Sequence, residues 1–220
     1  TVVITTSQAG LWTDSRYFLQ AAQQLKGTEI KLYKEMLPET PSISAFLSTQ
    51  LTPGDAVGID GKMFSAEEAE RMQAELQKCQ IKVKSISDPL DKLWTDRPPM
   101  PEAPAFIYET QYAGKSSIEK IAIIRKELKK CNAKALFLSA LDEIAWTLNL
   151  RGNDVHCNPV LVSYLLIEEN ETHYFIQPQK ITAEVATYMK ETGVNLHTYE
   201  EAEAYLSRIS VESLLLNPAK

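Results

Sequence analysis

Short apolar runs alternate with apolar residues at helical spacing along most of the chain, a pattern that predicts strands alternating with amphipathic helices. Residues 2–4 and 11–12 have the length and character of two strands, and the polar and glycine residues 7–10 suit the turn of a hairpin. A helix is predicted to follow, because Asp14 or Ser15 offers a side-chain oxygen to the free N–H groups of a first turn. The apolar face of this helix consists of Phe18, Ala21, Ala22 and Leu25.

The rest of the first half continues the alternation. A short helix is predicted to begin at Ser42 or Ser44. A longer one begins at Ser65, where Glu68 three residues later completes a capping box that satisfies two backbone donors. The apolar stripe predicted for the longer helix consists of Ala69, Met72, Leu76 and Cys79. Strands are predicted at residues 29–33, 56–59 and 81–85.

The second half adds strands and helices in the same manner. Ser116 and Glu119 form another capping box at the start of a helix. The buried stripe predicted for this helix consists of Ile118, Ile121, Ile124 and Leu128. Further helices are predicted at residues 141–148, 181–189 and 202–209. Strands are predicted at residues 105–108, 135–138, 160–167, 173–176 and 194–198. The pattern as a whole indicates an α/β fold class.

A proline-rich stretch between residues 88 and 104 interrupts this pattern. Proline fixes φ and lacks a backbone donor, so the stretch is not expected inside a sheet. We therefore expect two tandem domains, residues 1–96 and residues 97–220. The apolar residues expected to anchor the connection to one domain are Leu90, Leu93 and Trp94.

The order hairpin, helix, strand occurs twice, over residues 1–33 and again over residues 160–198. In the second half, a block of strand, helix, strand and helix at residues 105–148 precedes the hairpin, whereas nothing precedes the hairpin in the first half. We therefore expect the first domain to be truncated at its N-terminus, with an unpaired strand edge left exposed.

Composition narrows the class of protein. A hydrophobic fraction of 44% and a charged fraction of 24% are those of an ordinary globular protein. The formal net charge of −6 argues against nucleic-acid binding, because phosphate contacts require a basic surface. No apolar stretch approaches the roughly 20 residues that cross a bilayer, and no signal peptide is present. We therefore expect neither nucleic acid nor membrane as a partner.

The three cysteines are odd in number and widely spaced, so they predict neither a disulfide framework nor a zinc pattern. A reducing, cytoplasmic setting is expected. Cys79 and Cys131 are each expected to close the apolar face of a helix, where a thiol behaves as a small hydrophobic group.

Candidate metal and acid–base groups are few. His156, His173 and His197 are far apart, and no grouping of Asp, His and Glu has the spacing of a metal site, so none is expected. Phosphate-binding loops, a dinucleotide fingerprint and a nucleophile elbow are also missing from the sequence. Asp142 and Glu143 could suggest acid–base work, but neighbours on a helix diverge, and both suit the positive end of a helix.

Arg16 is the one candidate for a binding contact. Its guanidinium lies in the first turn of a predicted helix, where the helix dipole opposes a positive charge. The residue therefore has either an acidic partner such as Asp14 or a function. The residue types alone favour the surface ion pair.

Three sequence motifs, in order, carry a resemblance to a known family. They are Leu-Trp-Thr-Asp-Ser-Arg-Tyr-Phe-Leu-Gln-Ala-Ala at residues 11–22, Asp-Lys-Leu-Trp-Thr-Asp-Arg-Pro at 91–98, and a third set at 140–146, 149–152 and 158–160 that contains Asp-Glu-Ile-Ala-Trp, Asn-Leu-Arg-Gly and Asn-Pro-Val. Together they resemble the N-terminal and middle domains of Xaa-Pro aminopeptidases, also called aminopeptidase P, of the three-domain type.

The resemblance implies two tandem creatinase N-terminal-like domains, each a mixed β-sheet flanked by helices, as the non-catalytic N-terminal portion of such an enzyme. The parent hydrolyses the bond between an N-terminal residue and a following proline. Two divalent metals, usually manganese, sit in a C-terminal catalytic domain and are held by Asp, Asp, His, Glu and Glu, so no cofactor is expected in the present chain.

The resemblance also assigns roles. It places the peptide-binding arginine of the first motif at Arg16 and implies substrates with proline in the second position, a homodimeric parent and a wall and dimer-contact role for this portion. The structural interpretation is kept for Asp142, Arg151 and Asn158. A non-enzymatic creatinase-like protein-binding module is the main alternative, and an amidino-hydrolase related to creatinase fits the motifs less well.

Overall fold

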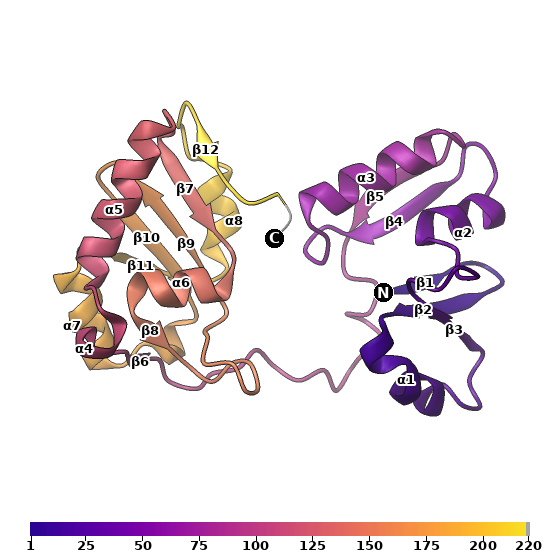
Figure 1. Ribbon diagram of the computed structural model, residues 1–220, viewed down its shortest axis with the longest axis horizontal. Helices are drawn as coiled ribbons and strands as arrows, with labels where there is room; N and C mark the ends of the chain where they lie inside the picture. The colour runs from indigo at the N-terminus through magenta and orange to yellow at the C-terminus, as the bar shows by residue number, and fades with distance from the viewer. Residues whose placement is uncertain (219–220) are drawn as a thin grey trace. The chain divides into compact units, whose positions relative to one another are not determined.

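The computed structural model describes residues 1–218, which form two compact units, Thr1–Thr95 and Asp96–Pro218 (Figure 1). Each unit combines β-sheet with flanking helices, so the predicted fold class is confirmed. No helix in the described part of the chain has the length and apolarity that crossing a bilayer requires.

The first unit opens with the predicted hairpin of β1 (Val2–Ile4) and β2 (Ala9–Thr13). Ile4 pairs with Ala9, so the turn lies at residues 5–8 and the prediction of a turn at 7–10 is wrong. The Thr5 hydroxyl closes the turn by accepting from the Gln8 backbone N–H at 3.0 Å. Gly10 is therefore a buried strand residue instead of a turn residue.

The hairpin continues into a 3₁₀ turn, η1 (Ser15–Tyr17), then into α1 (Phe18–Gln24), and returns as β3 (Ile30–Lys34), which pairs with β2 in parallel. Ala21 is buried as predicted, whereas Ala22 faces solvent. The apolar face of α1 is therefore narrower than the sequence predicts.

The first unit is completed by α2 (Ile43–Gln50), β4 (Ala56–Asp60), α3 (Ala66–Gln77) and β5 (Lys82–Ile86), with β4 and β5 parallel. Ser42 caps α2, and the predicted capping box of Ser65 and Glu68 is confirmed at α3. Cys79 is exposed, because α3 ends at Gln77 and the chain turns away through Gln80 at φ 59°. The core residues of this unit are Trp12, Phe46, Leu47, Leu76 and Ile81.

Residues 88–104 contain neither helix nor strand, in agreement with the proline content. Leu93 is 77% exposed, and Leu90 and Trp94 are nearly half exposed. None of the three belongs to the core of either unit, and their expected role in anchoring the connection to one domain stays a prediction. Backbone bonds from Leu93 and Trp94 to the Leu90 carbonyl, both 2.9 Å, close a local turn that leaves their side chains at the surface.

The second unit is built on a five-stranded mixed sheet in the order β11-β10-β9-β7-β12. β9 (Ser163–Glu168) and β10 (Thr172–Ile176) form the predicted hairpin, β11 (Asn195–His197) runs parallel to β10, and β7 (Ala135–Leu138) lies antiparallel to β9. β12 (Leu214–Leu215), which the apolar pattern did not predict, pairs with β7 in parallel. A short ladder of β6 (Phe106–Ile107) and β8 (Leu150–Arg151) lies outside this sheet.

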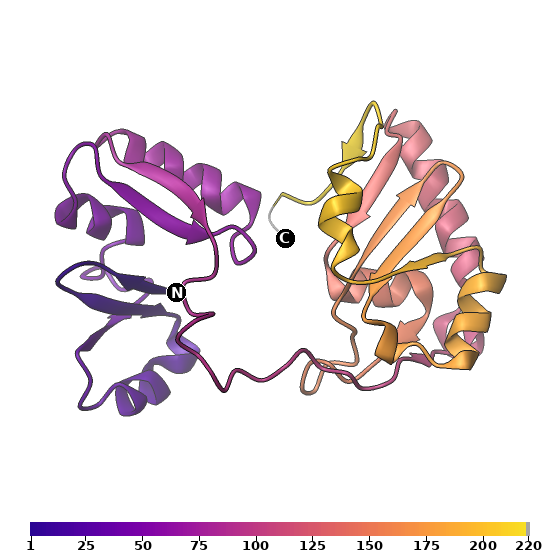
Figure 2. The ribbon, with the colours of Figure 1, turned by 180° about the vertical axis from the view of Figure 1, so that it is seen from behind.

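Helices cover both faces of this sheet (Figures 1 and 2). One face packs against a core that includes residues of α5 (Ser117–Lys130), α6 (Leu141–Leu148) and α7 (Ala183–Glu191). The other face, with Leu166 and Phe175, packs against α8 (Glu201–Leu206). The remaining helical segments are α4 (Thr110–Ala113) and the 3₁₀ turn η2 (Pro178–Lys180).

The capping box of Ser116 and Glu119 is confirmed at α5, but the buried face of this helix is rotated from the prediction. Ile118 is 55% exposed, while Ser117 and Lys120 are buried beside Ile121 and Leu128. Lys120 can occupy a core-facing position because its ammonium donates to the Trp146 carbonyl and to the Asn149 side chain. Cys131, at the end of α5, is exposed, so the expectation of a buried thiol is wrong there as well.

The two copies of the order hairpin, helix and strand also pair their strands in the same directions. In both units the hairpin strands are antiparallel, and the strand after the helix pairs in parallel with the second of them. The outer edge of β9 pairs with β7, but the corresponding edge of β1 has no partner strand within residues 1–218. The predicted open edge is therefore present in the first unit.

Candidate functional site

Residues of the first motif pack tightly at the end of β2. Trp12 is buried to 2% exposure, stacks on Tyr33 with ring centroids 3.9 Å apart, and donates its indole N–H to the Pro41 carbonyl at 2.9 Å. Gly10 makes room for this stack, because a Cβ there would lie 2.6 Å from the Tyr33 ring and 2.7 Å from the Trp12 ring. The chain therefore leaves β2 at a fixed point and in a fixed direction.

Asp14 and Arg16 follow directly after β2 and form an ion pair with two hydrogen bonds between their side chains. Asp14 caps η1 by accepting from the Arg16 backbone N–H at 3.0 Å. Its two carboxylate oxygens also accept from Nε and Nη2 of Arg16, each at 2.9 Å. The Arg16 side chain remains 78% exposed, so the structure contains the surface pair that the residue types favour.

This pairing keeps both groups charged. The hydrogen bonds from the Arg16 side chain and backbone lower the pKa of Asp14 from 3.8 to about 2. The same side-chain bond raises the pKa of Arg16. Because Nε and Nη2 face Asp14, the Nη1 end of the planar guanidinium points away from that carboxylate and offers donors to an external carbonyl or carboxylate.

The third motif is structural. Asn149 ends α6 in the left-handed conformation at φ 53°, and its side chain accepts from Lys120 Nζ at 2.6 Å and donates to the Lys115 carbonyl at 2.9 Å. Lys120 also donates to the Trp146 carbonyl at 2.8 Å and lies over the Trp146 ring. Burial lowers the pKa of Lys120, and these acceptors explain why a lysine occupies the buried face of α5.

Arg151 and Gly152 complete the turn after α6. Arg151 donates to the carbonyls of Ala145 and Leu150 and lies 4.7 Å above the Tyr108 ring. A Cβ at Gly152 would lie 2.2 Å from the Leu161 side chain, so only glycine fits there without a shift. These contacts give the Asn-Leu-Arg-Gly motif a packing and hydrogen-bonding role.

Asp142 and Glu143 lie in the first turn of α6, where the helix dipole favours carboxylates. Asn158 follows a tight backbone turn, in which its N–H donates to the Val155 carbonyl at 3.1 Å. All three residues belong to the second unit, whereas Arg16 belongs to the first.

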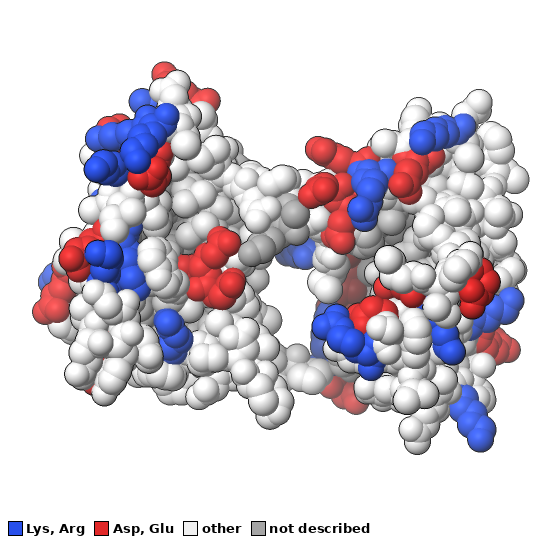
Figure 3. Space-filling view, viewed as in Figure 1, with Lys and Arg blue, Asp and Glu red and all other residues white. Residues whose placement is uncertain are grey.

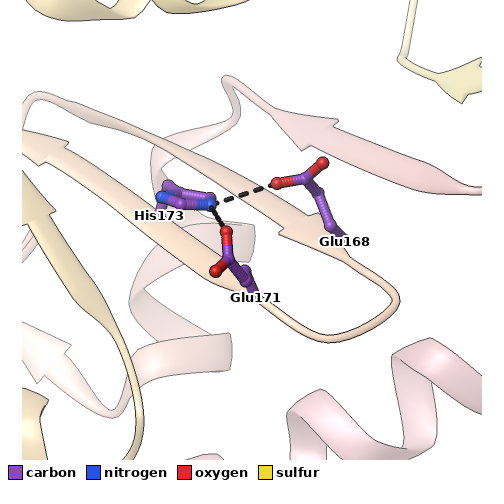
Figure 4. Close-up of side chains that lie close together, drawn as sticks. All are labelled: Glu168, Glu171 and His173. Atoms are coloured by element: carbon purple, nitrogen blue, oxygen red, sulfur yellow. Dashed lines mark ion pairs between the residues drawn. The ribbon is translucent and has the colours of Figure 1, made fainter. Parts of the chain in front are cut away.

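The structure reveals a titratable cluster that sequence spacing did not suggest. Glu168, Glu171 and His173 are the one group of three or more acidic, histidine or cysteine side chains in the described residues that could hold a metal ion. Figure 4 shows both carboxylates directed at the same imidazole nitrogen, Nε2, at 3.1 and 3.3 Å. His197, 24 residues away in sequence, contacts the other ring nitrogen at 3.0 Å, because β11 pairs in parallel with β10.

The signal that could have indicated this cluster is the grouping of two glutamates and a histidine around the turn of a predicted hairpin. Its three ligand atoms do not match the five-ligand, two-metal set that the family resemblance implies. Within residues 1–218 no other candidate metal group exists, so the chain described here does not fit a two-metal centre.

Comparisons with known proteins cover the whole chain. The family model described as Creatinase/Prolidase N-terminal domain matches residues 96–220, and a second model with the same description matches residues 1–93. The chain is 35% identical over 224 residues to Aminopeptidase P2 of Arabidopsis thaliana, which covers 100% of this chain and 31% of the relative. It is 37% identical over 198 residues to Xaa-Pro aminopeptidase ApepP of Drosophila melanogaster, covering 89% and 32%.

A solved structure agrees with these relatives. The X-prolyl aminopeptidase of Caenorhabditis elegans, described as a cytosolic enzyme with a di-nuclear active site, superposes with a TM-score of 0.89 at 31% identity. The match covers 94% of this chain and 34% of that one. The chain thus spans about a third of the length of the relatives it matches. These matches confirm the resemblance drawn from the sequence motifs.

Proposed function

Because the chain belongs to the creatinase/prolidase N-terminal domain family, we propose that it is the non-catalytic N-terminal portion of an Xaa-Pro aminopeptidase. The observation that carries the proposal is the coverage: aminopeptidase P relatives match 100% and 89% of the chain, while the chain accounts for about a third of each. The parent enzyme hydrolyses the bond between an N-terminal residue and a following proline, in the cytoplasm.

The chemistry of that reaction belongs to residues outside this chain. In the parent, two divalent metal ions, manganese in this proposal, supply an activated water and stabilise the developing oxyanion. The cluster at His173 offers three ligand atoms and no second set beside it, so no catalytic step is assigned to the residues described here.

The chain contributes binding surface. We assign Arg16 to the peptide: its guanidinium is exposed and permanently charged, and Asp14 holds it in one orientation. A planar guanidinium fixed in this way binds a peptide carbonyl or terminal carboxylate with little loss of side-chain freedom. The remaining surface forms part of the cleft wall and the contacts of a homodimer.

A direct test compares the 220-residue chain with the full-length parent on an Arg-Pro-Pro peptide, both supplied with Mn²⁺. We expect release of arginine by the parent and none by the chain, measured by mass spectrometry. Cleavage by the purified chain would overturn the proposal, since it would require a catalytic centre within these residues.

The Arg16 assignment is tested in the parent. Replacing Arg16 with alanine removes one charged hydrogen bond, so kcat/KM should fall by an amount equivalent to about 1.5 to 3 kcal/mol. Arg208→Ala, an exposed arginine in the second unit, is the matched control and should leave kcat/KM unchanged. If Arg16→Ala behaves like the control, Arg16 does not contact the substrate.

One observation favours the alternative of a protein-binding module. On the face drawn in Figure 3, acidic side chains gather over α3 and near α6, where Glu67 and Glu68, and Asp142 and Glu143, occupy the first turns. Such surfaces suit basic partners. Retention of the chain on immobilised basic proteins at physiological salt, together with an inactive full-length parent, would favour this function over the peptidase.

A further inference from the structure

The cluster of Glu168, Glu171 and His173, here called the His173 cluster, has no part in the function proposed above. Glu168 ends β9, Glu171 ends the hairpin turn, and His173 is the second residue of β10. His173 is 5% exposed, whereas Glu168 and Glu171 are 21% and 63% exposed. The cluster is therefore anchored in the fold at its imidazole and open to solvent at its carboxylates.

Three side-chain oxygens lie within hydrogen-bond distance of Nε2 of His173. Nε2 faces Glu168 at 3.1 Å, Glu171 at 3.3 Å and the Tyr205 hydroxyl at 3.0 Å. A ring nitrogen carries at most one proton and can donate it to one carboxylate at a time. No lysine or arginine within residues 1–218 pairs with either carboxylate, since Lys129 pairs with Glu169 and Arg125 with backbone carbonyls. Two carboxylates thus face one ring nitrogen, which can donate a hydrogen bond to only one of them.

The opposite side of the ring faces a possible hydrogen-bond acceptor. Nδ1 of His173 lies 3.0 Å from Nε2 of His197. When Nδ1–H donates to His197, the Nε2 lone pair is left pointing at the two carboxylates. Metal-ligating histidines are oriented in this manner by an acceptor at their second nitrogen.

The main chain that carries the carboxylates is also held in place. Arg125 of α5 donates through Nε to the Glu168 carbonyl at 2.9 Å and through Nη2 to the Glu171 carbonyl at 3.0 Å. Its second bond from Nη2, to the Thr172 hydroxyl at 3.1 Å, ties the same turn to β10. A ligand set on a clamped hairpin loses little conformational entropy when it binds an ion.

We propose that Glu168, Glu171 and His173 bind one divalent transition-metal ion, and that zinc fits this donor set best. A mixed set of imidazole nitrogen and carboxylate oxygen suits Zn²⁺ at about 2.0 to 2.2 Å, which places tetrahedral ligand atoms about 3.3 to 3.6 Å apart. The observed separations from Nε2, 3.1 and 3.3 Å, lie at or just below the short end of that range, so the two carboxylates move apart by a few tenths of an ångström when the ion binds. A water molecule on the solvent side, or the Tyr205 hydroxyl on the side of the fold, completes the coordination.

The test is calorimetric titration of Zn²⁺ into the metal-stripped 220-residue chain. It is performed in a background with Cys79, Cys131 and Cys157 replaced by serine, because these exposed thiols would bind zinc independently. We expect one ion per chain. Glu171→Gln, at an exposed position that the fold does not need, should weaken the affinity at least about tenfold. Glu169→Gln, in the same turn but paired with Lys129, should leave it unchanged.

His173→Ala should abolish binding, and circular dichroism distinguishes this loss from unfolding. Glu168→Gln combined with Glu171→Gln provides the same test without altering the buried ring. Co²⁺ in place of Zn²⁺ should give the absorption bands of a tetrahedral site, which Glu171→Gln should diminish. Failure to bind zinc, or equal affinity in Glu171→Gln and Glu169→Gln, would show that the cluster holds a proton only and would overturn the proposal. Neither result depends on peptidase activity.

Discussion

At the scale of single residues, the motifs contain side chains that shape the fold and an exposed cation, Arg16, that does not. Trp12 and Gly152 act through packing, and Asn149 acts through its left-handed backbone and buried hydrogen bonds. Arg16 differs because Asp14 orients it at the surface and most of its side chain is in solvent. An exposed, oriented cation suits the binding contact proposed for Arg16, whereas the partly buried Arg151 is occupied with carbonyls.

The Asp14–Arg16 pair makes a prediction about pH. Because the pKa of Asp14 is lowered from 3.8 to about 2, its stabilising contribution is fully present at neutral pH and is lost progressively as the pH falls from about 3.8 through about 2. NMR titration of the Asp14 carboxyl carbon in the 220-residue chain should show a midpoint near 2. In Arg16→Gln the midpoint should return toward 3.8. A midpoint near 3.8 in the unchanged chain would mean that the pair does not form in solution.

At the scale of elements, both units contain the same hairpin, helix and strand, but the first strand of the hairpin has different neighbouring strands in the two units. β9 lies between β10 and β7, whereas β1 has β2 on one side only within the described residues. Thr1 and Trp12 exchange both backbone hydrogen bonds at 2.8 Å, so the backbone groups of Val2 and Ile4 face the open edge. The side chains of Val2 and Ile4 are 54% and 72% exposed, which makes this edge apolar as well as unpaired.

We therefore expect the 220-residue chain, expressed by itself, to self-associate through β1. Ile4→Lys places a charge on the open edge and should reduce association, measured by sedimentation velocity over a range of concentrations. Leu19→Lys makes a similar change of side chain at an exposed position on α1 and serves as the control. If both variants associate as the unchanged chain does, the contact lies elsewhere.

At the scale of the whole molecule, each unit has its own core. The residues of the first core all precede Thr95, and those of the two clusters in the second unit all follow Asp96. Between them, residues 88–104 lack regular structure, and the two family matches end at residue 93 and begin at residue 96. These observations support a domain boundary close to the expected division between residues 96 and 97, which we propose for the protein in solution.

This boundary predicts a site of limited proteolysis. Lys92 is exposed in a turn followed by irregular chain, so brief trypsin treatment should cut there before it cuts inside either unit. Mass spectrometry identifies the cut, and Lys92→Gln should slow it. First cleavage within α3 or α5 would show that a unit opens more readily than the connection does, contrary to the boundary.

Local chemistry made much of this molecule predictable from sequence. Ser65 and Ser116 identified helix starts because a capping box depends on residues three apart, and the prolines identified the irregular connection because they remove backbone donors. Patterns that depend on register were less well predicted. The hairpin turn was placed two residues late, and the buried face of α5 was rotated, because hydrophobicity alone did not reveal that Lys120 would find acceptors in the core.

The sequence by itself determined the α/β class, the repeated hairpin, the family motifs and the location of Arg16 in the first turn after β2, since each depends on neighbours along the chain. Tertiary structure alone decided which residues distant in sequence meet. The parallel pairing of β10 with β11 brought His197 against His173, and α8 brought Tyr205 to the same ring. Strand pairing acts over tens of residues, so the spacing of the three histidines along the chain carried no information about that contact.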